Sequence, residues 1–507
     1  MTAGLVGAID QGTTSTRFVI FDRQGSIVTY HQMEFDQHYP HPGWVEHDPH
    51  DLLETAKTCM EHAVRKLEGM GYSRKDIATI GITNQRETTI AWDAETSEPL
   101  YPAIVWSDSR TGHTVKTLAE LGDGGVNALQ SVCGLPLTTY FSAVKLKWMV
   151  DNVPAVKNAL EQGRLRFSTV DTWLIYHLTG GPGKGILVTD VTNASRTMLM
   201  DIHTLEWSQK AIDFFGFQGI HLARIVSSSA VYGHVVGGIL EGVPIAGCLG
   251  DQQAALVGQK CFHQGDAKNT YGTGCFMLFN TGDKPVLSKN GLLTTIAYQF
   301  GSEAPVYALE GSVAVAGSSI QWLRDNLGVI KNAQEINELA AQVEDTSGVY
   351  FVTAFTGLFA PYWRNDARGT VCGITQYTNK CHLARATLEA VCYQSKAILD
   401  AMNQEANTPL RSLRVDGGMS NSDLAMQIQS DILGIPVDRP VMRETTALGS
   451  AIAAGLAVDF WSSLDEIHNV NTENRTVFEP KISDEKRKAM YRGWQSAVER
   501  SYGWVQA

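Results

Sequence analysis

Residues 4–17 of the chain read GLVGAIDQGTTSTR, and they form the most informative stretch of the sequence. An apolar run over residues 5–9 ends in Asp10, and a small, hydroxyl-rich loop then leads into a second apolar run over residues 18–21. The pattern predicts a β-hairpin whose loop can wrap phosphate oxygens with backbone N–H groups and hydroxyls. The acid at the end of the strand is placed to hold the Mg²⁺ of a nucleotide. Taken alone, the stretch fits an ordinary hairpin slightly better, with Gly12 supplying a positive φ.

A second loop of the same kind makes phosphate binding the better interpretation of the first. Residues 269–277 read NTYGTGCFM, and the Gly-Thr-Gly core suits close approach of the backbone to an anion. A third glycine site, Asp416-Gly417-Gly418, follows a predicted strand and precedes a helix predicted over residues 424–432. Two phosphate-type loops, one in each half, and a late Asp-Gly-Gly predict an α/β protein with the actin-like (ribonuclease H-like) ATPase fold. In that fold two domains flank a catalytic cleft.

The length of the chain also predicts more than one domain, because single hydrophobic cores stop growing well below 507 residues. We expect an N-terminal domain over residues 1–258, carrying the first loop, and a nucleotide-binding C-terminal domain over residues 259–507. A helix is predicted to begin at Pro49, with an apolar stripe at a period of 3.6 residues. Further strands are expected over residues 26–33, 77–82 and 244–248. Further helices are expected over residues 313–327, 383–402 and 447–456.

Charge and cysteine usage limit the partners and the compartment. The formal net charge of −12 argues against nucleic acid or an anionic membrane as the main partner, since both require a basic footprint. The eight cysteines are scattered and form no C-x-x-C pair, so we expect buried thiols in a reducing compartment. No apolar run reaches about 18 residues, and no leader is apparent, so neither membrane insertion nor secretion is expected. The predicted location is the cytoplasm.

Six polar or aromatic residues are candidates for binding or catalysis. Arg86 and Glu87 follow a buried-looking strand, and a solvated ion pair and a polyol-binding pair are about equally good interpretations. Trp106 ends another predicted strand, and by itself a core aromatic is the preferred interpretation; the pair Tyr140-Phe141 is equally ambiguous alone. Asp251 precedes a predicted helix. A helix N-cap is the simpler interpretation, but open α/β folds place ligand groups at this kind of strand end. There a carboxylate could take the proton of an attacking hydroxyl.

At this point several stretches resemble one family closely. The stretches are residues 10–17 (DQGTTSTR), 43–49 (GWVEHDP), 84–89 (NQRETT), 192–198 (TNASRTM), 250–256 (GDQQAAL) and 269–277. They resemble the glycerol kinases, a branch of the FGGY carbohydrate kinases, and the likeness runs from about residue 5 to about residue 505. Some stretches, such as residues 138–145, resemble eukaryotic members more than bacterial ones.

The resemblance implies ATP-dependent phosphorylation of glycerol to sn-glycerol 3-phosphate, in glycerol catabolism and glycerolipid supply, with ATP and Mg²⁺ and as a homodimer. It implies that Asp251 is the general base and that Asp10 and Asp251 hold Mg²⁺. It implies a glycerol site made of Arg86, Glu87, Tyr140, Asp251 and Gln252, with Trp106 and Phe276 packing on the carbon backbone. It implies a nucleotide site made of Thr13, Thr14, Ser15, Arg17, Thr273, Gly317, Gln321 and Gly418.

The chain departs from the family pattern in two places. The family has an asparagine four residues beyond the second glycine of Asp-Gly-Gly. Here Ser422 takes that place and Asn421 precedes it, so the adenosine contact is open between the two. Bacterial members are often inhibited by fructose 1,6-bisphosphate, which they bind through a glycine-rich loop containing an arginine. The matching residues 235–242, VVGGILEG, contain no Lys or Arg. We therefore expect insensitivity to this bisphosphate.

Two alternatives remain open from the sequence. One is an FGGY kinase that acts on a pentulose or a longer polyol. The Arg86-Glu87 pair and three aromatics argue against it, because they suit a small triol better. An actin-like ATPase without a small-molecule acceptor would lack a substrate base beside the nucleotide. Turnover on different acceptors separates both from a glycerol-phosphorylating enzyme.

Overall fold

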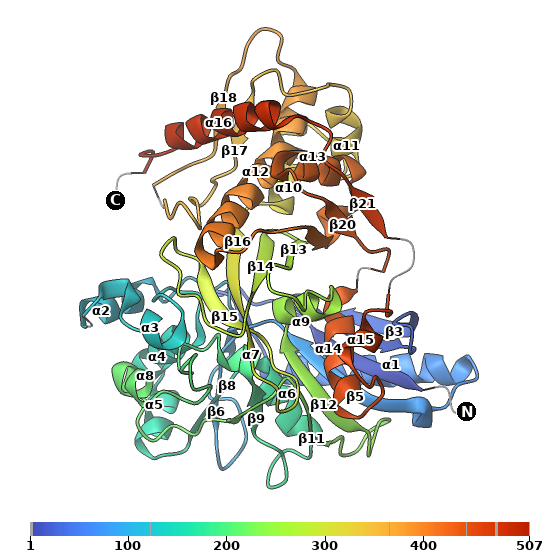
Figure 1. The fold of residues 1–507 in the computed structure, drawn as a ribbon. Helices are drawn as coiled ribbons and strands as arrows, with labels where there is room; N and C mark the ends of the chain where they lie inside the picture. Colours follow the sequence, from blue (N-terminus) through green and yellow to red (C-terminus); the bar gives the residue numbers. More distant parts are fainter. Residues whose placement is uncertain (1–3, 122, 365, 443, 472–474, 506–507) are drawn as a thin grey trace.

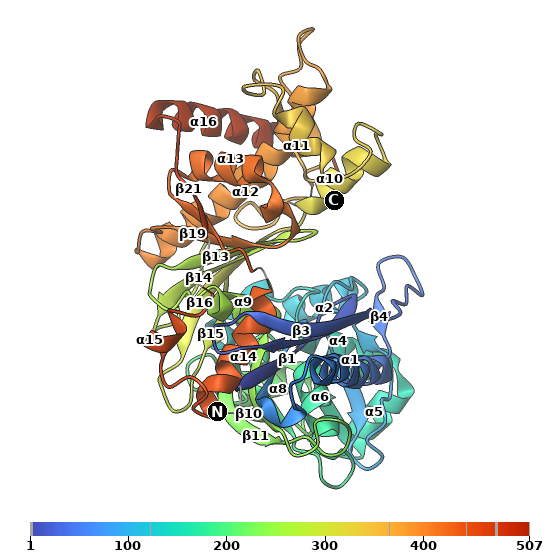
Figure 2. The same ribbon diagram turned by 90° about the vertical axis from the view of Figure 1, so that its right-hand side faces the viewer.

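The computed structural model describes residues 4–121, 123–364, 366–442, 444–471 and 475–505. The chain forms two lobes that lie one above the other, each built on a β-sheet with helices packed against it (Figures 1 and 2). The blue and green first half of the chain makes most of the lower lobe in these views. The yellow and orange part of the second half makes most of the upper lobe.

The first sheet has six strands in the order β11-β12-β5-β1-β2-β3. β1 pairs in parallel with β5 and antiparallel with β2, and β5 pairs in parallel with β12. The hairpin predicted at the start of the chain is therefore confirmed as β1 and β2. The strands are β1 (Leu5–Gln11), β2 (Ser15–Phe21), β3 (Ile27–Glu34), β5 (Ile77–Asn84), β11 (Ser229–His234) and β12 (Pro244–Gly250).

The second sheet has seven strands in the order β15-β16-β14-β13-β19-β20-β21. From β16 to β21 its order and strand directions repeat those of the first sheet read from β3 to β11, with β15 as an addition. The two halves of the chain therefore share one sheet topology. The strands are β13 (Ala267–Tyr271), β14 (Cys275–Gly282), β15 (Leu293–Tyr298), β16 (Val306–Val313), β19 (Leu413–Asp416), β20 (Val437–Arg439) and β21 (Thr476–Phe478).

Shorter elements complete the described part of the chain. Four two-stranded sheets pair β4 (Glu46–His47) with β7 (Ala103–Ile104), β6 (Ile90–Asp93) with β8 (Leu165–Ser168), β9 (Val188–Asp190) with β10 (Arg224–Val226), and β17 (Tyr350–Val352) with β18 (Thr370–Cys372). Single turns of 3₁₀ helix are η1 (Arg74–Asp76), η2 (Gly125–Asn127) and η3 (Gly418–Asn421). The α-helices are α1 (Pro49–Gly69), α2 (Gly112–Leu121), α3 (Gln130–Cys133), α4 (Ser142–Asn152), α5 (Pro154–Glu161), α6 (Val170–Leu178), α7 (Val191–Ala194), α8 (Gln209–Phe215), α9 (Asp251–Gly258), α10 (Gly317–Asp325), α11 (Glu335–Ala340), α12 (Lys380–Ala406), α13 (Asp423–Leu433), α14 (Thr445–Ala457), α15 (Leu464–Ile467) and α16 (Asp484–Arg500).

Helices cover both faces of the first sheet, which explains why residues 5–9, the part of β1 before Asp10, are all apolar. Leu5 and Ile9 pack into the cluster that contains the buried stripe of α1, whereas Val6 and Ala8 pack into the cluster that contains α14. Successive side chains of a strand point to opposite faces, so a strand covered on both sides must be apolar at every position. The start of α1 is as predicted: Asp48 accepts from the backbone N–H of His50, and proline follows at the first helical position.

α14 lies on the first sheet although it follows most of the second sheet in the chain. It packs against α9, β5 and β12, and Figure 1 shows it, in red, beside β5 in the lower lobe. The backbones of α9 and α14 touch, because a Cβ at Gly449 would lie 1.8 Å from the carbonyl oxygen of Ala254. The chain thus returns to the first lobe after residue 444. The division of the domains at residue 258 stays a prediction.

One predicted helix was wrong at its start. The helix expected over residues 313–327 is α10, which begins at Gly317. Val313 instead ends strand β16, where it pairs with Cys275. Residues 306–313 form a strand in the sheet, and the short apolar stretch at its end, residues 313–316, does not distinguish a strand from a helix by its period.

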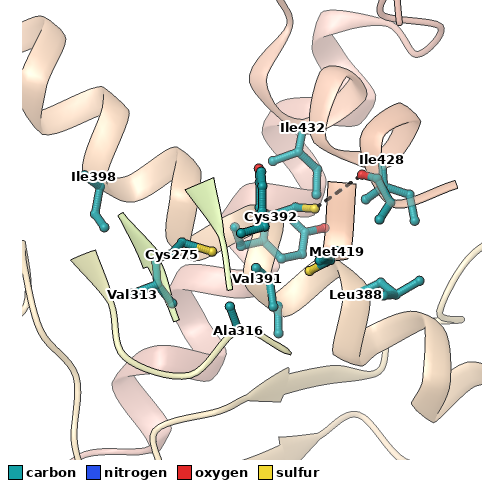
Figure 3. Close-up of a cluster of buried hydrophobic side chains, with 14 of the residues drawn as sticks. Cys275, Val313, Ala316, Leu388, Val391, Cys392, Ile398, Met419, Ile428 and Ile432 are labelled. Carbon is teal, nitrogen blue, oxygen red and sulfur yellow. Dashed lines mark hydrogen bonds between the residues drawn. The ribbon is translucent and has the colours of Figure 1, made fainter. Parts of the chain in front are cut away.

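The core of the upper lobe lies between the second sheet and helices α12 and α13. Figure 3 shows Cys275 and Val313 of the sheet facing Val391, Cys392 and other apolar side chains of these helices. All eight cysteines are free thiols, and seven of them are buried, as predicted from their scattered apolar positions. In the described residues, none of the helices combines the length and the apolar character needed to cross a membrane.

Candidate active site

Asp10 lies at the end of β1, where it faces Arg17 across the hairpin. Nη2 of Arg17 is 3.0 Å from Oδ2 of Asp10, and Nη1 of Arg17 donates to Glu444, which immediately precedes α14. Burial raises the pKa of Asp10 to about 6, with Arg17 opposing the shift and Glu444 and Asp251 adding to it. Arg17 is thus shared by two carboxylates, one from each half of the chain.

The predicted phosphate loop between β1 and β2 is a tight turn. The N–H of Gly12 donates to the carbonyl of Ser15 at 3.0 Å. Two of its hydroxyls already have partners, since Trp106 donates to Thr13 at 2.9 Å and Gln32 to Ser15 at 3.1 Å. Thr14 is the exposed member of the loop. The loop therefore offers backbone and hydroxyl groups at the lobe surface, as an anion-binding turn requires.

Arg86 is buried, with 3% of its surface exposed, and this excludes the solvated ion pair. Its guanidinium binds Glu310 of β16 in a two-pronged pair, with Nη2 3.1 Å from Oε1 and Nη1 on Oε2. Nε lies 3.2 Å from Oδ1 of Asp251, and Nη2 lies 3.5 Å from the hydroxyl of Tyr140. Burial alone would lower the pKa of Arg86, but the attraction of Glu310 and its neighbours outweighs it and raises the pKa. Arg86 is therefore a permanent cation.

Glu87 is buried beside Arg86 but is paired with another residue. Nε of Arg196, just after α7, donates to Oε1 of Glu87 at 2.6 Å, and Nη2 of Arg196 donates to Oε1 of Glu310 at 3.0 Å. Burial raises the pKa of Glu87, and the attraction of Arg196 and Arg86 offsets only part of this increase. Glu87 has a φ of 59°, a left-handed conformation that costs energy for a side chain of this size. Local strain of this kind is concentrated at functional sites.

The three predicted aromatics come together next to these charges. The ring of Trp106 lies 5.7 Å from that of Tyr140 and 6.0 Å from that of Phe276, both in edge-on contacts. Each of the three is only partly buried, which leaves ring surface open to a ligand. Phe276 comes from β14, so the group is assembled from both halves of the chain. Such walls suit the carbon backbone of a small polyol.

Asp251 is the first residue of α9, and its N-cap is Gly250, so the N-cap interpretation of Asp251 is wrong by one residue. Its Oδ1 accepts from the N–H of Gln252 at 2.7 Å and lies by Nε of Arg86. The side chain is 30% exposed, and among the described residues Oδ2 has no hydrogen-bond partner. One carboxylate oxygen is thus held in place while the other is available to a ligand.

Gln252 is bound by a buried lysine that the sequence interpretation missed. Nζ of Lys268 donates to Oε1 of Gln252 at 2.5 Å and to the hydroxyl of Thr270 at 2.9 Å. Burial lowers the pKa of Lys268 to about 8, although Asp416 and Asp251 favour its charged form. Because lysine only donates, it occupies the oxygen of the Gln252 amide, and the amide NH₂ is left to donate elsewhere.

The residues predicted to hold Mg²⁺ have the chemistry that this ion needs. Asp10 and Asp251 are carboxylates near enough that the charge of Asp251 raises the pKa of Asp10. Oδ2 of Asp10 is also buried without a hydrogen bond of good geometry. Two mutually repelling carboxylates with an unsatisfied oxygen fit a hard divalent cation, which prefers oxygen ligands from one or two carboxylates and from phosphates.

The second predicted loop, between β13 and β14, packs on the start of α10. The carbonyl of Thr273 accepts from the N–H groups of Ala316 at 2.9 Å and Ser318 at 3.1 Å. The approach is so close at Gly317 that a Cβ there would lie 2.6 Å from the carbonyl oxygen of Gly272. The predicted nucleotide residues Thr273 and Gly317 are therefore brought together, and only glycine fits at Gly317.

The other predicted nucleotide residues differ in their surroundings. Gln321 and Gly418 are exposed, on α10 and at the start of η3. Ser422 is occupied by structural contacts, since its hydroxyl caps α13 by accepting from Ala425 at 3.0 Å and donates to Asn337 at 2.5 Å. These contacts leave Ser422 little capacity to bind an adenosine. All the predicted nucleotide contacts remain predictions.

The sequence interpretation missed Glu310 and Arg196 as members of this site. Glu310 had a visible signal: it is the single charged residue of an otherwise apolar, buried strand, β16. Arg196 lay within one of the stretches that carried the family resemblance. Neither signal says which charges pair, because Glu310 and Arg86 are separated by 224 positions in the chain.

A second acidic group lies in the core of the first lobe. Asp171, Asp190 and Cys248 bring ligand-type atoms within 4.8 Å of one another. The carboxylate oxygens are already occupied: Asp171 accepts from the Thr169 and Thr189 hydroxyls, and Asp190 accepts from the first turn of α7 and from Ser228. These contacts describe a structural hydrogen-bond network that anchors α7, which precedes Arg196.

The chain matches one protein family over most of its length. Residues 5–258 match the N-terminal domain of the FGGY family of carbohydrate kinases, and residues 267–458 match its C-terminal domain. The chain is 53% identical to the glycerol kinase of Chloroflexus aggregans over 504 residues, which is 99% of this chain and 100% of that protein. It is 53% identical to glycerol kinase 1 of Streptomyces coelicolor, with 99% of each covered.

A solved structure is similar over the whole molecule. The crystal structure of Plasmodium falciparum glycerol kinase with ADP superimposes with a TM-score of 0.92 and 39% identity, covering 100% of this chain and 99% of that one. The actin-like, two-domain α/β fold is therefore confirmed. The two bacterial relatives are more similar in sequence than this eukaryotic one, so these three do not support the predicted likeness to eukaryotic members.

Proposed function

The chain belongs to the FGGY family of carbohydrate kinases, and we propose that it transfers the γ-phosphoryl group of ATP to a terminal hydroxyl of glycerol. The observation that carries the proposal is the position of Asp251. One carboxylate oxygen is bound by Arg86, and the other is free to face the site that Arg86, Tyr140 and Trp106 line. The products are sn-glycerol 3-phosphate and ADP.

The reaction follows from the groups present. Oδ2 of Asp251 accepts the proton of the attacking glycerol hydroxyl while the hydroxyl oxygen bonds to the γ-phosphorus. The bond between the γ-phosphorus and the bridging oxygen breaks, and ADP leaves. Arg17 and the hydroxyls of Thr13, Thr14 and Ser15 would donate to the phosphoryl oxygens. Asp10 and Asp251 would hold Mg²⁺, which supplies positive charge to offset that of the phosphates. The proton then leaves Asp251 to water.

The triol would bind through donors and acceptors that face one another. The longest contact of Arg86 is that between Nη2 and the hydroxyl of Tyr140, at 3.5 Å, so this is the donor that a substrate hydroxyl can most easily take. Glu87 would accept from a second hydroxyl, and the NH₂ of Gln252 would donate to an oxygen of the substrate. Trp106 and Phe276 would cover the carbons. The Arg86-Glu87 pair and the three aromatic rings suit a small triol better than a pentulose.

A test of the proposal couples ADP release to acceptor turnover. Glycerol, erythritol and xylulose are each offered with ATP and Mg²⁺, and the phosphorylated product is identified by mass spectrometry. We expect glycerol to have by far the highest kcat/KM. Preference for xylulose would indicate a different FGGY activity, and ATP hydrolysis without any phosphorylated acceptor would indicate an ATPase.

The location and assembly are also part of the proposal. We place the enzyme in the cytoplasm, which fits eight free thiols, and we propose a homodimer by likeness to the family.

We predict that fructose 1,6-bisphosphate does not inhibit the phosphorylation of glycerol by this enzyme. Residues 235–242, between β11 and β12, carry Glu241 and no cationic side chain, and Val236 is 54% exposed. A bisphosphate needs donors and positive charge, and a nearby carboxylate repels it. Steady-state phosphorylation of glycerol is measured while the bisphosphate is titrated to about millimolar levels, in the range of weak metabolite binding. A dose-dependent loss of rate would contradict the prediction.

A further inference from the structure

Four charged side chains form a buried network between the halves of the chain. Arg86, Glu87, Arg196 and Glu310 have between 0% and 3% of their surface exposed, and the two positive charges balance the two negative ones. Glu310 is the sole contribution of the second sheet, and it accepts from both arginines. Burying four charges is costly, and apolar residues of similar size often stabilise a fold as well or better. The network therefore calls for a reason other than stability.

The network fixes the orientation of Arg86 completely. Nε faces Asp251, Nη1 faces Glu310 and Gln253, and Nη2 faces Glu310 and the hydroxyl of Tyr140. The two-pronged pair with Glu310 sets the plane of the guanidinium, since both prongs must lie in that plane. Without Glu310, the strongest restraint on the direction of the Nη2 edge toward Tyr140 is lost.

Arg196 restrains Glu87 in a similar way. It bridges Oε1 of Glu87 and Oε1 of Glu310, and its guanidinium carbon lies 5.6 Å from the ring centre of Tyr140. Among the described residues, Oε2 of Glu87 has no hydrogen-bond partner, so one oxygen is anchored and the other is available. Nη1 of Arg196 is itself buried without a partner. An unsatisfied buried donor costs stability, so the network is arranged for geometry at the expense of stability.

From these contacts we propose that Glu310 and Arg196 are positioning residues for the polyol. Glu310 holds the donor edge of Arg86, and Arg196 holds Glu87, so that a donor and an acceptor face the same substrate. Binding of the substrate hydroxyls would then depend on the carboxylate of Glu310, which comes from the second sheet. The proposal rests on the proposed function, because it assigns Arg86 and Glu87 to glycerol.

The chain contains a matched control for a purely structural role. Glu389 of α12 is a buried carboxylate paired with Arg385 at 3.1 Å, in the core of the upper lobe and away from the polyol site. Glu389→Gln replaces a buried, arginine-paired carboxyl without touching the proposed site, and burial raises the pKa of Glu389 to about 7, so the side chain carries only part of a charge near neutral pH. Its effect on stability and on KM is the reference for Glu310→Gln.

The experiment measures KM for glycerol and for ATP separately, together with kcat and Tm, in wild type, Glu310→Gln, Arg196→Lys and Glu389→Gln. We expect Glu310→Gln to raise the KM for glycerol roughly 10- to 100-fold, as expected for loss of charge-assisted hydrogen bonds, and to leave the KM for ATP unchanged. Arg196→Lys keeps the charge but cannot bridge two carboxylates, so it should raise the KM for glycerol as well. Glu389→Gln should lower Tm and leave both KM values unchanged.

Each outcome decides the proposal. A folded Glu310→Gln protein with a lowered Tm and an unchanged KM for glycerol would assign the network to stability alone and overturn it. The same holds if Glu310→Gln raises the KM for glycerol and the KM for ATP by the same factor. If Glu310→Gln does not fold, Glu310→Asp and Arg196→Lys decide by the same KM comparison. A wild-type protein that does not phosphorylate glycerol would contradict the proposed function, which is a separate failure.

Discussion

Asp251→Asn is expected to leave the protein folded and to lower kcat by roughly 10²- to 10⁴-fold, the usual contribution of a general base. The amide oxygen of asparagine can still accept from the N–H of Gln252 and from Nε of Arg86, the two contacts that Oδ1 makes now. The neutral amide cannot take the proton of the substrate hydroxyl. Loss of a carboxylate facing Asp10 also weakens the proposed Mg²⁺ site.

The measurement is single-turnover and steady-state kinetics at saturating glycerol and ATP, with Tm as the check on folding. Asp484→Asn is a matched control, because Asp484 is likewise the first residue of a helix, α16, and is paired with Arg487. α16 lies in the upper lobe, away from the candidate site (Figure 1). It should have normal kcat. Near-normal kcat in purified Asp251→Asn would remove Asp251 from the role of base.

Arg86→Ala should have the largest combined effect on substrate binding and on stability. Its removal leaves Glu310 with Arg196 as its remaining arginine and takes away the guanidinium that Asp251 contacts. Breaking a buried ion pair by removing one partner costs about 3–5 kcal/mol in the free energy of unfolding. If Arg86 binds a hydroxyl that does not react, the KM for glycerol should rise more than kcat falls.

Denaturant unfolding and steady-state kinetics test the two effects separately. Arg86→Lys is the control: it keeps a positive charge beside Glu310 but lacks the planar fork. It should recover most of the stability and little of the affinity for glycerol. An Arg86→Ala protein that is folded and has an unchanged KM for glycerol would show that Arg86 contributes only to the fold.

Much of the fold could be predicted because its patterns are local. The hydroxyl-rich loop after Asp10 joins two apolar runs, and the Gly-Thr-Gly loop before Cys275 joins a short polar segment to an apolar run. The structure has hairpins at both places. The N-cap at Asp48 and the apolar stripe of α1 are equally local signals. A signal that depends on a few neighbouring residues survives in any tertiary context that allows the element to form.

The sequence predicted which residues belong to the candidate site better than it predicted how these residues pair. Arg86 and Glu87 are adjacent in sequence, which suggested that they form a pair. The structure instead pairs Arg86 with Glu310 and Glu87 with Arg196, partners 224 and 109 positions away. A buried charge binds whichever opposite charge the packing of the sheets places beside it, because the low local dielectric makes that contact far stronger than one across water.

By itself, the sequence determined the two hairpins, the α/β class and the family, because those depend on short patterns and on residue identity. Only the tertiary structure decided that α14 returns to the first lobe, that Glu310 of the second sheet enters the proposed polyol site, and that Lys268 orients Gln252. The first two join residues far apart in the chain, and the third joins a helix to the strand that follows it. Their meeting depends on how the sheets and helices pack as a whole, and no local pattern records that packing.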